Sequence, residues 1–190
     1  MAVNPMYGCR MLEVTPLDEY GAPKIEDAEL FEVPQEANVT FNIDEGDEQE
    51  LRGGDRLIAK VKEEDYLTSA DITFTNAVLN AAAIKIITGG GTIEGDDGFK
   101  APTLSEQETG RDAFQARLYV ARYNEGTVDV GDEIDYTRFT FHNCKGTLSG
   151  FNPTGGEFVV PEFNIHCTEN TAAEEPIYEF DFVNELPTSS

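Results

Sequence analysis

Residues 66–90 read YLTSADITFTNAVLNAAAIKIITGG, and this stretch decides the fold class. Up to Thr75, apolar and polar residues alternate, which is the two-residue period of a half-buried strand. Alanine, leucine and isoleucine then recur with helical spacing, so we predict a helix over residues 76–88 whose N-cap is Asn76 or the threonine before it. The glycines at 89–91 follow the helix, where a left-handed C-terminal cap is expected.

Further strand-like segments lie on both sides of this stretch, because apolar residues alternate with polar ones between turn signals. NVTFNI at residues 38–43 is the clearest of them, whereas residues 24–33 fit either a strand or a short helix. The others span residues 9–15, 56–62, 113–123, 135–149, 157–168 and 177–183. About eight strands and one helix predict a mainly β chain: an antiparallel β-sandwich or barrel with one short flanking α-helix and extended loops.

Two polar segments are expected to be exposed connections between strands. DEGDEQELRGGD at residues 44–55 is charged and contains three glycines, and residues 92–112 are polar and glycine-rich. No internal repeat or linker divides the sequence, so residues 1–190 are expected to form a single domain. Within it, residues 1–8 are expected to form an N-terminal arm and residues 184–190 a loose C-terminal tail.

The chain is strongly acidic, with a formal net charge of -24 and a sequence pI of about 4.1. Such a surface repels phosphate, which disfavours ordinary nucleic-acid binding and binding to anionic membranes. Two interpretations of the acidity remain open. It keeps the protein soluble, or it prevents one face from binding a polyanion.

The three cysteines, Cys9, Cys144 and Cys167, do not form a disulfide framework in a chain of this length. We therefore expect reduced thiols and assembly in a reducing cytoplasm. The N-terminus lacks the apolar core of a signal peptide, and no stretch approaches the ~20 apolar residues that a membrane span needs. The sequence thus predicts a soluble protein.

Residues suited to catalysis or metal binding are sparse. His142 and Cys144 are spaced to share one face of a strand, so a site with His166 and Cys167 can be imagined if the two strands pair. The CxxC and HExxH spacings typical of zinc are missing, no GxSxG accompanies the histidines, and the acidic runs lack EF-hand spacing. We therefore expect no enzyme, no catalytic residue, no metal site and no cofactor.

Four stretches, taken in order, resemble one known family. Strands lead into a short helix that ends in glycine in the stretch LIAKVKEEDYLTSADITFTNAVLNAAAIKIITGG (57–90). A short arm before a first strand is suggested by MAVNPMYGCRMLEV (1–14). ARLYVARYNEGTV (116–128) and FTFHNCKGTLSG (139–150) look like closing strands. This order of elements resembles the major tail tube proteins of tailed bacteriophages.

The resemblance implies a β-sandwich or barrel subunit of which six copies form a ring, with rings stacked into a hollow tube. The tube would be an electronegative conduit for genome ejection, located in the virion tail and assembled in the host cytoplasm. Implied partners are other copies of the chain and the tape measure and tail terminator proteins, while DNA passes without specific binding. The net charge of -24 agrees with a conduit that repels phosphate.

The resemblance also implies that a loop between early strands contacts the next ring, and the candidate here runs from Asp44 to Asp55. Like-charged loops resist stacking unless they meet basic groups, so we predict that Arg52 and Arg56 pair with acidic groups of a neighbouring subunit. The alternative is that both arginines are simply exposed to solvent. The candidate inter-subunit residues are Asp44, Glu45, Asp47, Glu48, Arg52 and Arg56.

Two other classes of function remain open. A β-sandwich binding module, such as a decoration or fibre domain of a virion, would share the composition and the number of strands. A protein similar to the tail terminator would form one ring and stop there.

Overall fold

The computed structural model describes residues 5–188 except 54, 96–97, 109 and 124–132. The described residues form twelve strands, two α-helices and one short 3-10 helix. The strands are β1 (Met6–Pro16), β2 (Glu29–Phe31), β3 (Pro34–Asp44), β4 (Glu48–Gly53), β5 (Arg56–Lys62), β6 (Tyr66–Asn76), β7 (Thr92–Glu94), β8 (Gly98–Lys100), β9 (Phe114–Tyr123), β10 (Glu133–Gly150), β11 (Glu162–Thr168) and β12 (Tyr178–Val183). The helices are η1 (Ile25–Asp27), α1 (Ala81–Thr88) and α2 (Leu104–Glu108).

Eight of these strands form one antiparallel sheet in the order β2-β1-β9-β10-β11-β6-β3, and β12 also pairs with β10. The long strand β10 connects the two halves of the sheet. Residues 136–141 of β10 pair with β12, and residues 143–150 pair with β11 on the same side. The predicted mainly β, antiparallel fold with a short flanking helix is therefore confirmed.

The sheet folds over on itself, because side chains from distant strands meet in one core. Phe31 of β2 lies 5.3 Å from Phe74 of β6 and 5.5 Å from Phe163 of β11, measured between ring centroids. All three rings are buried, and they join aliphatic side chains from β1, β9 and α1 in a single cluster. Burial of this apolar cluster is the main source of stability in the fold.

Helix α1 closes one end of the core and begins later than the sequence predicted. Residues up to Asn76 continue β6, and Asn80 is the N-cap, because its side-chain oxygen accepts hydrogen bonds from the amides of Ala82 and Ala83. The predicted caps at Asn76 and Thr75 are therefore wrong. The predicted C-terminal cap is confirmed, since Gly89 is left-handed with φ of 64°.

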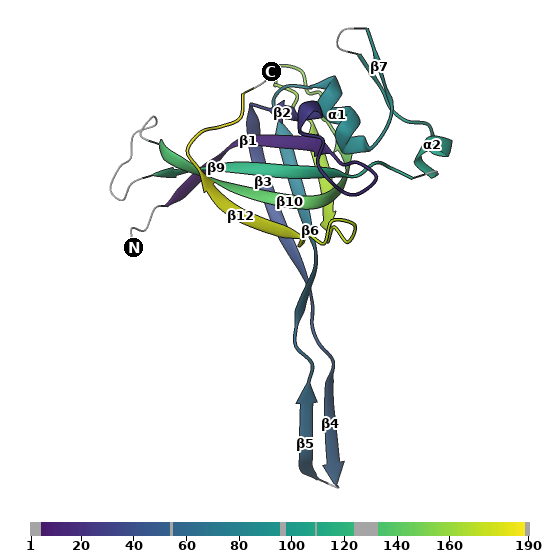
Figure 1. The fold of residues 1–190 in the computed structure, drawn as a ribbon, viewed down its shortest axis with the longest axis vertical. Helices are drawn as coiled ribbons and strands as arrows, with labels where there is room; N and C mark the ends of the chain where they lie inside the picture. The colour runs from purple at the N-terminus through teal and green to yellow at the C-terminus, as the bar shows by residue number, and fades with distance from the viewer. Residues whose placement is uncertain (1–4, 54, 96–97, 109, 124–132, 189–190) are drawn as a thin grey trace.

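The segment predicted as a loop over residues 44–55 is instead the start of a long two-stranded arm. β4 and β5 pair antiparallel as an extension of β3 and β6, and the arm projects away from the folded body (Figure 1). From the end of β3 to the tip, about ten residues of extended chain give a reach of about 30 Å.

The remaining connections carry more structure than expected. The region 92–112 contains the β7–β8 hairpin and the one-turn helix α2. At the N-terminus β1 already begins at Met6, and after Val183 the chain forms no helix or strand as far as Thr188, the last residue described. Neither of the α-helices in the described part of the chain has the length and apolar character required to cross a bilayer.

Candidate assembly site

The base of the arm is held by a network of backbone and side-chain contacts. The amide of Glu63 donates to the carbonyl of Asp47 at 3.0 Å, and Asp65 accepts from the amide of Gly46 at 3.1 Å. Lys62 lies 3.1 Å from the same carboxylate, and these contacts, Lys62 first, lower the pKa of Asp65. Gly46 is required here, because a Cβ atom would lie 2.3 Å from the carbonyl oxygen of Glu63. The arm therefore leaves the body in a defined direction.

The predicted inter-subunit residues all lie on this arm or at its base. Asp44 accepts a hydrogen bond from the Tyr66 hydroxyl at 2.9 Å, which raises the pKa of that tyrosine. Glu48 pairs with Lys60 at 2.7 Å, and Glu45 and Asp47 lie in the short connection between β3 and β4. The structure thus brings these acidic candidates together at the base of the arm.

The two candidate arginines lie further out and differ from each other. Arg52 pairs with Glu50 of its own strand at 2.8 Å, so its charge is already partly compensated. Arg56 is the first residue of β5, beside the tip, is exposed, and has no ion pair among the described residues. Arg56 is therefore the arginine that is free to bind a partner.

One face of the arm is apolar and is exposed to solvent. Leu51 pairs with Ala59 across the two strands, and Val61 is on the same face because strand residues two apart point the same way. Leu51 is 60% exposed and Val61 65% exposed. A two-stranded hairpin is marginally stable by itself in water, so an exposed apolar face on a projecting hairpin indicates a contact with another molecule.

The arm is also electrostatically distinct from the body. Residues 48–62 carry a net charge of +1, whereas the rest of the chain accounts for -25 of the total of -24. The basic side chains in this segment are Arg52, Arg56, Lys60 and Lys62, and the acidic ones are Glu48, Glu50 and Asp55. The arm therefore lacks the strong negative charge by which the bodies of two copies repel each other.

A second unpaired surface lies along β12, an edge strand of the sheet. Phe180 and Phe182 are 57% and 59% exposed, and their rings are 6.1 Å apart. Phe180 also lies 6.0 Å from Phe139, and the Arg122 guanidinium sits 4.0 Å from the centre of the Phe182 ring. Exposed aromatic rings beside an arginine have the composition of a protein–protein contact.

The opposite face of the same strands holds β12 in place through charged contacts. Glu13 accepts from Arg117 at 3.1 Å and from the Tyr119 hydroxyl at 2.7 Å, and burial together with this bond raises the pKa of Tyr119. Arg138 makes two hydrogen bonds to Asp181 of β12, at 2.9 and 2.5 Å. Arg138 is also hydrogen-bonded to Tyr119, so side-chain contacts link the four adjacent strands β1, β9, β10 and β12.

The histidines and cysteines do not gather into one site. Strands β10 and β11 do pair, which was the condition for a site that joins these four residues. The Sγ atoms of Cys144 and Cys167 lie 3.0 Å apart in the core. A shift in register after Phe141 breaks the alternation, so Cys144 joins the core cluster whereas His142 does not. His166 is on the solvent face, 2.6 Å from a carboxylate oxygen of Asp71. Within the described residues, no group of three or more His, Cys, Asp or Glu side chains is placed to hold a metal ion.

Comparison with models of known protein families found no match, and comparison with curated proteins found none either. The candidate site therefore rests on the geometry of the arm and of the body. Sequence reasoning found the charged residues of the arm but missed the aromatic surface of β12. The signal was present, because Tyr178, Phe180 and Phe182 recur at every second position.

Proposed function

We propose that this chain is a structural subunit that assembles with copies of itself, and specifically a tail tube subunit of a tailed bacteriophage. In this role six copies form a ring, the rings stack, and the acidic tube conducts the genome without binding it. The number six and the tail location come from the resemblance to tail tube proteins. The proposal extends to tape measure and terminator proteins as partners, and it assigns no catalytic activity.

The observation that carries the proposal is the β4–β5 arm. It projects from the body (Figure 1), it leaves apolar side chains such as Leu51 and Val61 in solvent, and its net charge of +1 over residues 48–62 contrasts with the acidic rest of the chain. Such a hairpin gains little stability by itself, which favours a chain that contacts another molecule through it. A neighbouring copy would cover the apolar face and provide a partner for Arg56.

The direction of the arm supports open-ended stacking. β3 and β6 run side by side from the pair Pro34–Asn76 at one end to the pair Asp44–Tyr66 at the arm. The arm therefore leaves from one end of the body, and in the proposed stack it meets the opposite end of its neighbour. Contacts between two different surfaces repeat, and they close into a ring or continue as a filament.

The test is size-exclusion chromatography of the purified chain followed by negative-stain electron microscopy. Tubes or stacked rings are the expected result. A single closed ring that never stacks favours a terminator-like role, and a monodisperse monomer at every concentration favours a β-sandwich binding module and contradicts the proposal.

A further inference from the structure

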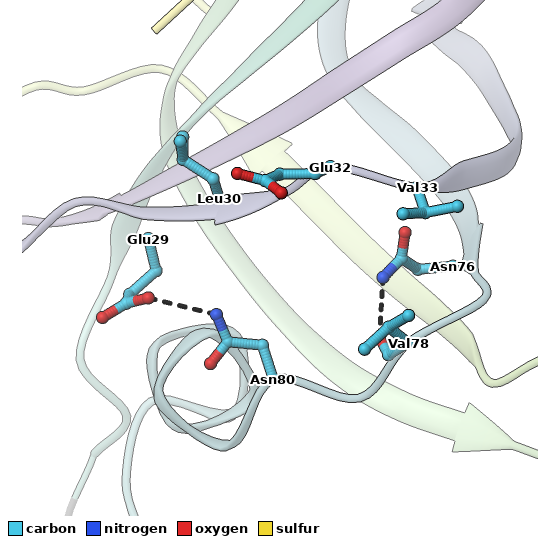
Figure 2. Close-up of a pocket in the computed structure, with 7 residues that line it drawn as sticks. All are labelled: Glu29, Leu30, Glu32, Val33, Asn76, Val78 and Asn80. Atoms are coloured by element: carbon cyan, nitrogen blue, oxygen red, sulfur yellow. Dashed lines mark hydrogen bonds between the residues drawn. The ribbon is translucent and has the colours of Figure 1, made fainter. Parts of the chain in front are cut away.

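A small pocket lies at the end of the body opposite the arm. It forms between β2 and the segment that leads from β6 into α1 (Figure 2). Asn76, the last residue of β6, lines this pocket, whereas Tyr66 at the other end of the strand adjoins the arm. The ten residue steps between them correspond to about 33 Å. The pocket and the arm are therefore at opposite ends of the same strands.

The pocket combines acidic groups with apolar walls. Two carboxylates line it, those of Glu29 and Glu32, and the side chains of Leu30, Val33 and Val78 form much of the rest. Glu29 accepts a hydrogen bond from the Asn80 amide at 3.1 Å. No contact with a basic group is shown for Glu32 within the described residues. The pocket therefore holds uncompensated negative charge.

A buried hydrogen-bond acceptor adds to this acidic lining. Asn76 is only 2% exposed, and its side-chain nitrogen donates to the carbonyl of Val78 at 2.6 Å. Its side-chain oxygen has no hydrogen-bond partner, and in Figure 2 it points toward Val33 and the Glu32 side of the pocket. A buried oxygen without a donor is costly, so the site favours a ligand that brings an N–H group.

The shape of the site favours a side chain over a metal ion. Figure 2 shows Glu29, Glu32 and Asn76 spread around the pocket, and they do not turn toward one central point as metal ligands do. A guanidinium group has five N–H donors in one plane and can bond several separated acceptors. Its aliphatic stem would pack against Val33 and Val78, as arginine stems do on apolar surfaces.

We infer that this pocket binds an arginine from the arm of a second copy of the chain, and that the arginine is Arg56. Arg56 is exposed beside the tip of the arm and has no ion pair among the described residues. Copies stacked along the direction of the strands bring the arm of one subunit toward the pocket end of the next. The inference rests on the proposed self-assembly and gives it a residue-level contact.

The experiment exchanges the two charges and measures tube formation by ultracentrifugation and negative-stain microscopy. Arg56→Glu and Glu32→Arg each place like charges together, and each is expected to raise the critical concentration for assembly about tenfold or more. The double variant restores opposite charges and is expected to recover most of the wild-type yield. Both residues are exposed, so thermal unfolding should match wild type in every variant.

The matched control is Glu36→Arg, which makes the same change of charge on β3 outside the pocket. It is expected to leave the yield of tubes close to wild type. Single variants that assemble normally, or a double variant no better than either single one, would overturn the pocket assignment while the proposed function stands. Assembly that depends on added calcium and is abolished by a chelator would also overturn it. A wild-type chain that stays monomeric would overturn the proposed function itself, and with it the contact.

Discussion

Removal of the arm should separate folding from assembly. In the variant, residues 48–62 are replaced by an Asn-Gly turn that joins Asp47 to Glu63. These two residues are already adjacent, because the amide of Glu63 bonds the carbonyl of Asp47 at 3.0 Å. An Asn-Gly pair suits a two-residue hairpin connection, so β3 and β6 should keep their register.

The expected change in stability is small. The arm adds no side chain to the core cluster, and Leu51 and Val61 are already more than half exposed. The deletion halves the length of the connection roughly three times over. This lowers the free-energy cost of closing the loop by at most about 2 kcal/mol. The free energy of unfolding should therefore be equal to wild type or up to about 2 kcal/mol higher.

The assay combines urea unfolding, followed by circular dichroism, with sedimentation of assembled material. The variant should unfold cooperatively, as the wild type does, and should form no tubes. Tubes at the wild-type yield would refute the role of the arm. A loss of more than about 3 kcal/mol of stability would refute the view that the arm is independent of the core.

Three further results are expected from the body of the protein. Phe163→Ala removes a fully buried ring and should cost about 3–5 kcal/mol in urea unfolding, and a loss below 1 kcal/mol would contradict the assigned core. The hydrogen bond from His166 lowers the pKa of Asp71, so the carboxylate adds stability above its ordinary pKa of 3.8 and loses this contribution as the pH falls through the lower folded value. The urea midpoint of Asp71→Asn should therefore lie slightly below that of wild type near neutral pH, and the difference should disappear in acid. A difference that grows in acid would argue against the Asp71–His166 contact. Burial raises the pKa of Cys144 well above 9.0, and Cys167 is equally buried. A thiol reagent should therefore label both cysteines only as fast as the chain unfolds. Rapid labelling of the native protein would contradict this packing.

Alternation in the sequence located β6 closely, because every second side chain from Ala70 to Phe74 is buried in the core. It also located β9 and β12, although β9 is buried on both faces and the aromatic side chains Phe180 and Phe182 of β12 are exposed. The arm was harder to predict. RLIAKVK (56–62) has a strand-like composition, but its partner EQELRG (48–53) has low β propensity and becomes a strand only by pairing with it.

Tertiary contacts also decided the start of α1. The apolar stripe extends back to Val78, so the pattern alone places the helix start at Asn76. In the folded chain Ala77 donates to the carbonyl of Val33 at 3.1 Å, and this contact with the segment between β2 and β3 keeps residues 77–79 out of the helix. Asn80 then provides the cap.

The pocket at the far end could not be predicted from sequence. Glu29 and Glu32 are separated from Asn76 by more than forty residues, and only the pairing of β3 with β6 brings the two segments together. Their residue types are ordinary for an acidic chain, so no local motif marks them. The charged residues of the arm can be recognised in the sequence. The pocket that is proposed to bind Arg56 is formed only when the chain folds.

The most direct test of self-assembly through the arm is cryo-electron microscopy of the purified wild-type chain at high concentration. Self-assembly through the arm predicts stacked rings in which the β4–β5 arm of each subunit crosses to the next ring and its tip reaches the pocket between β2 and α1. Particles that remain single subunits, or assemblies in which the arm stays in solvent, would contradict it.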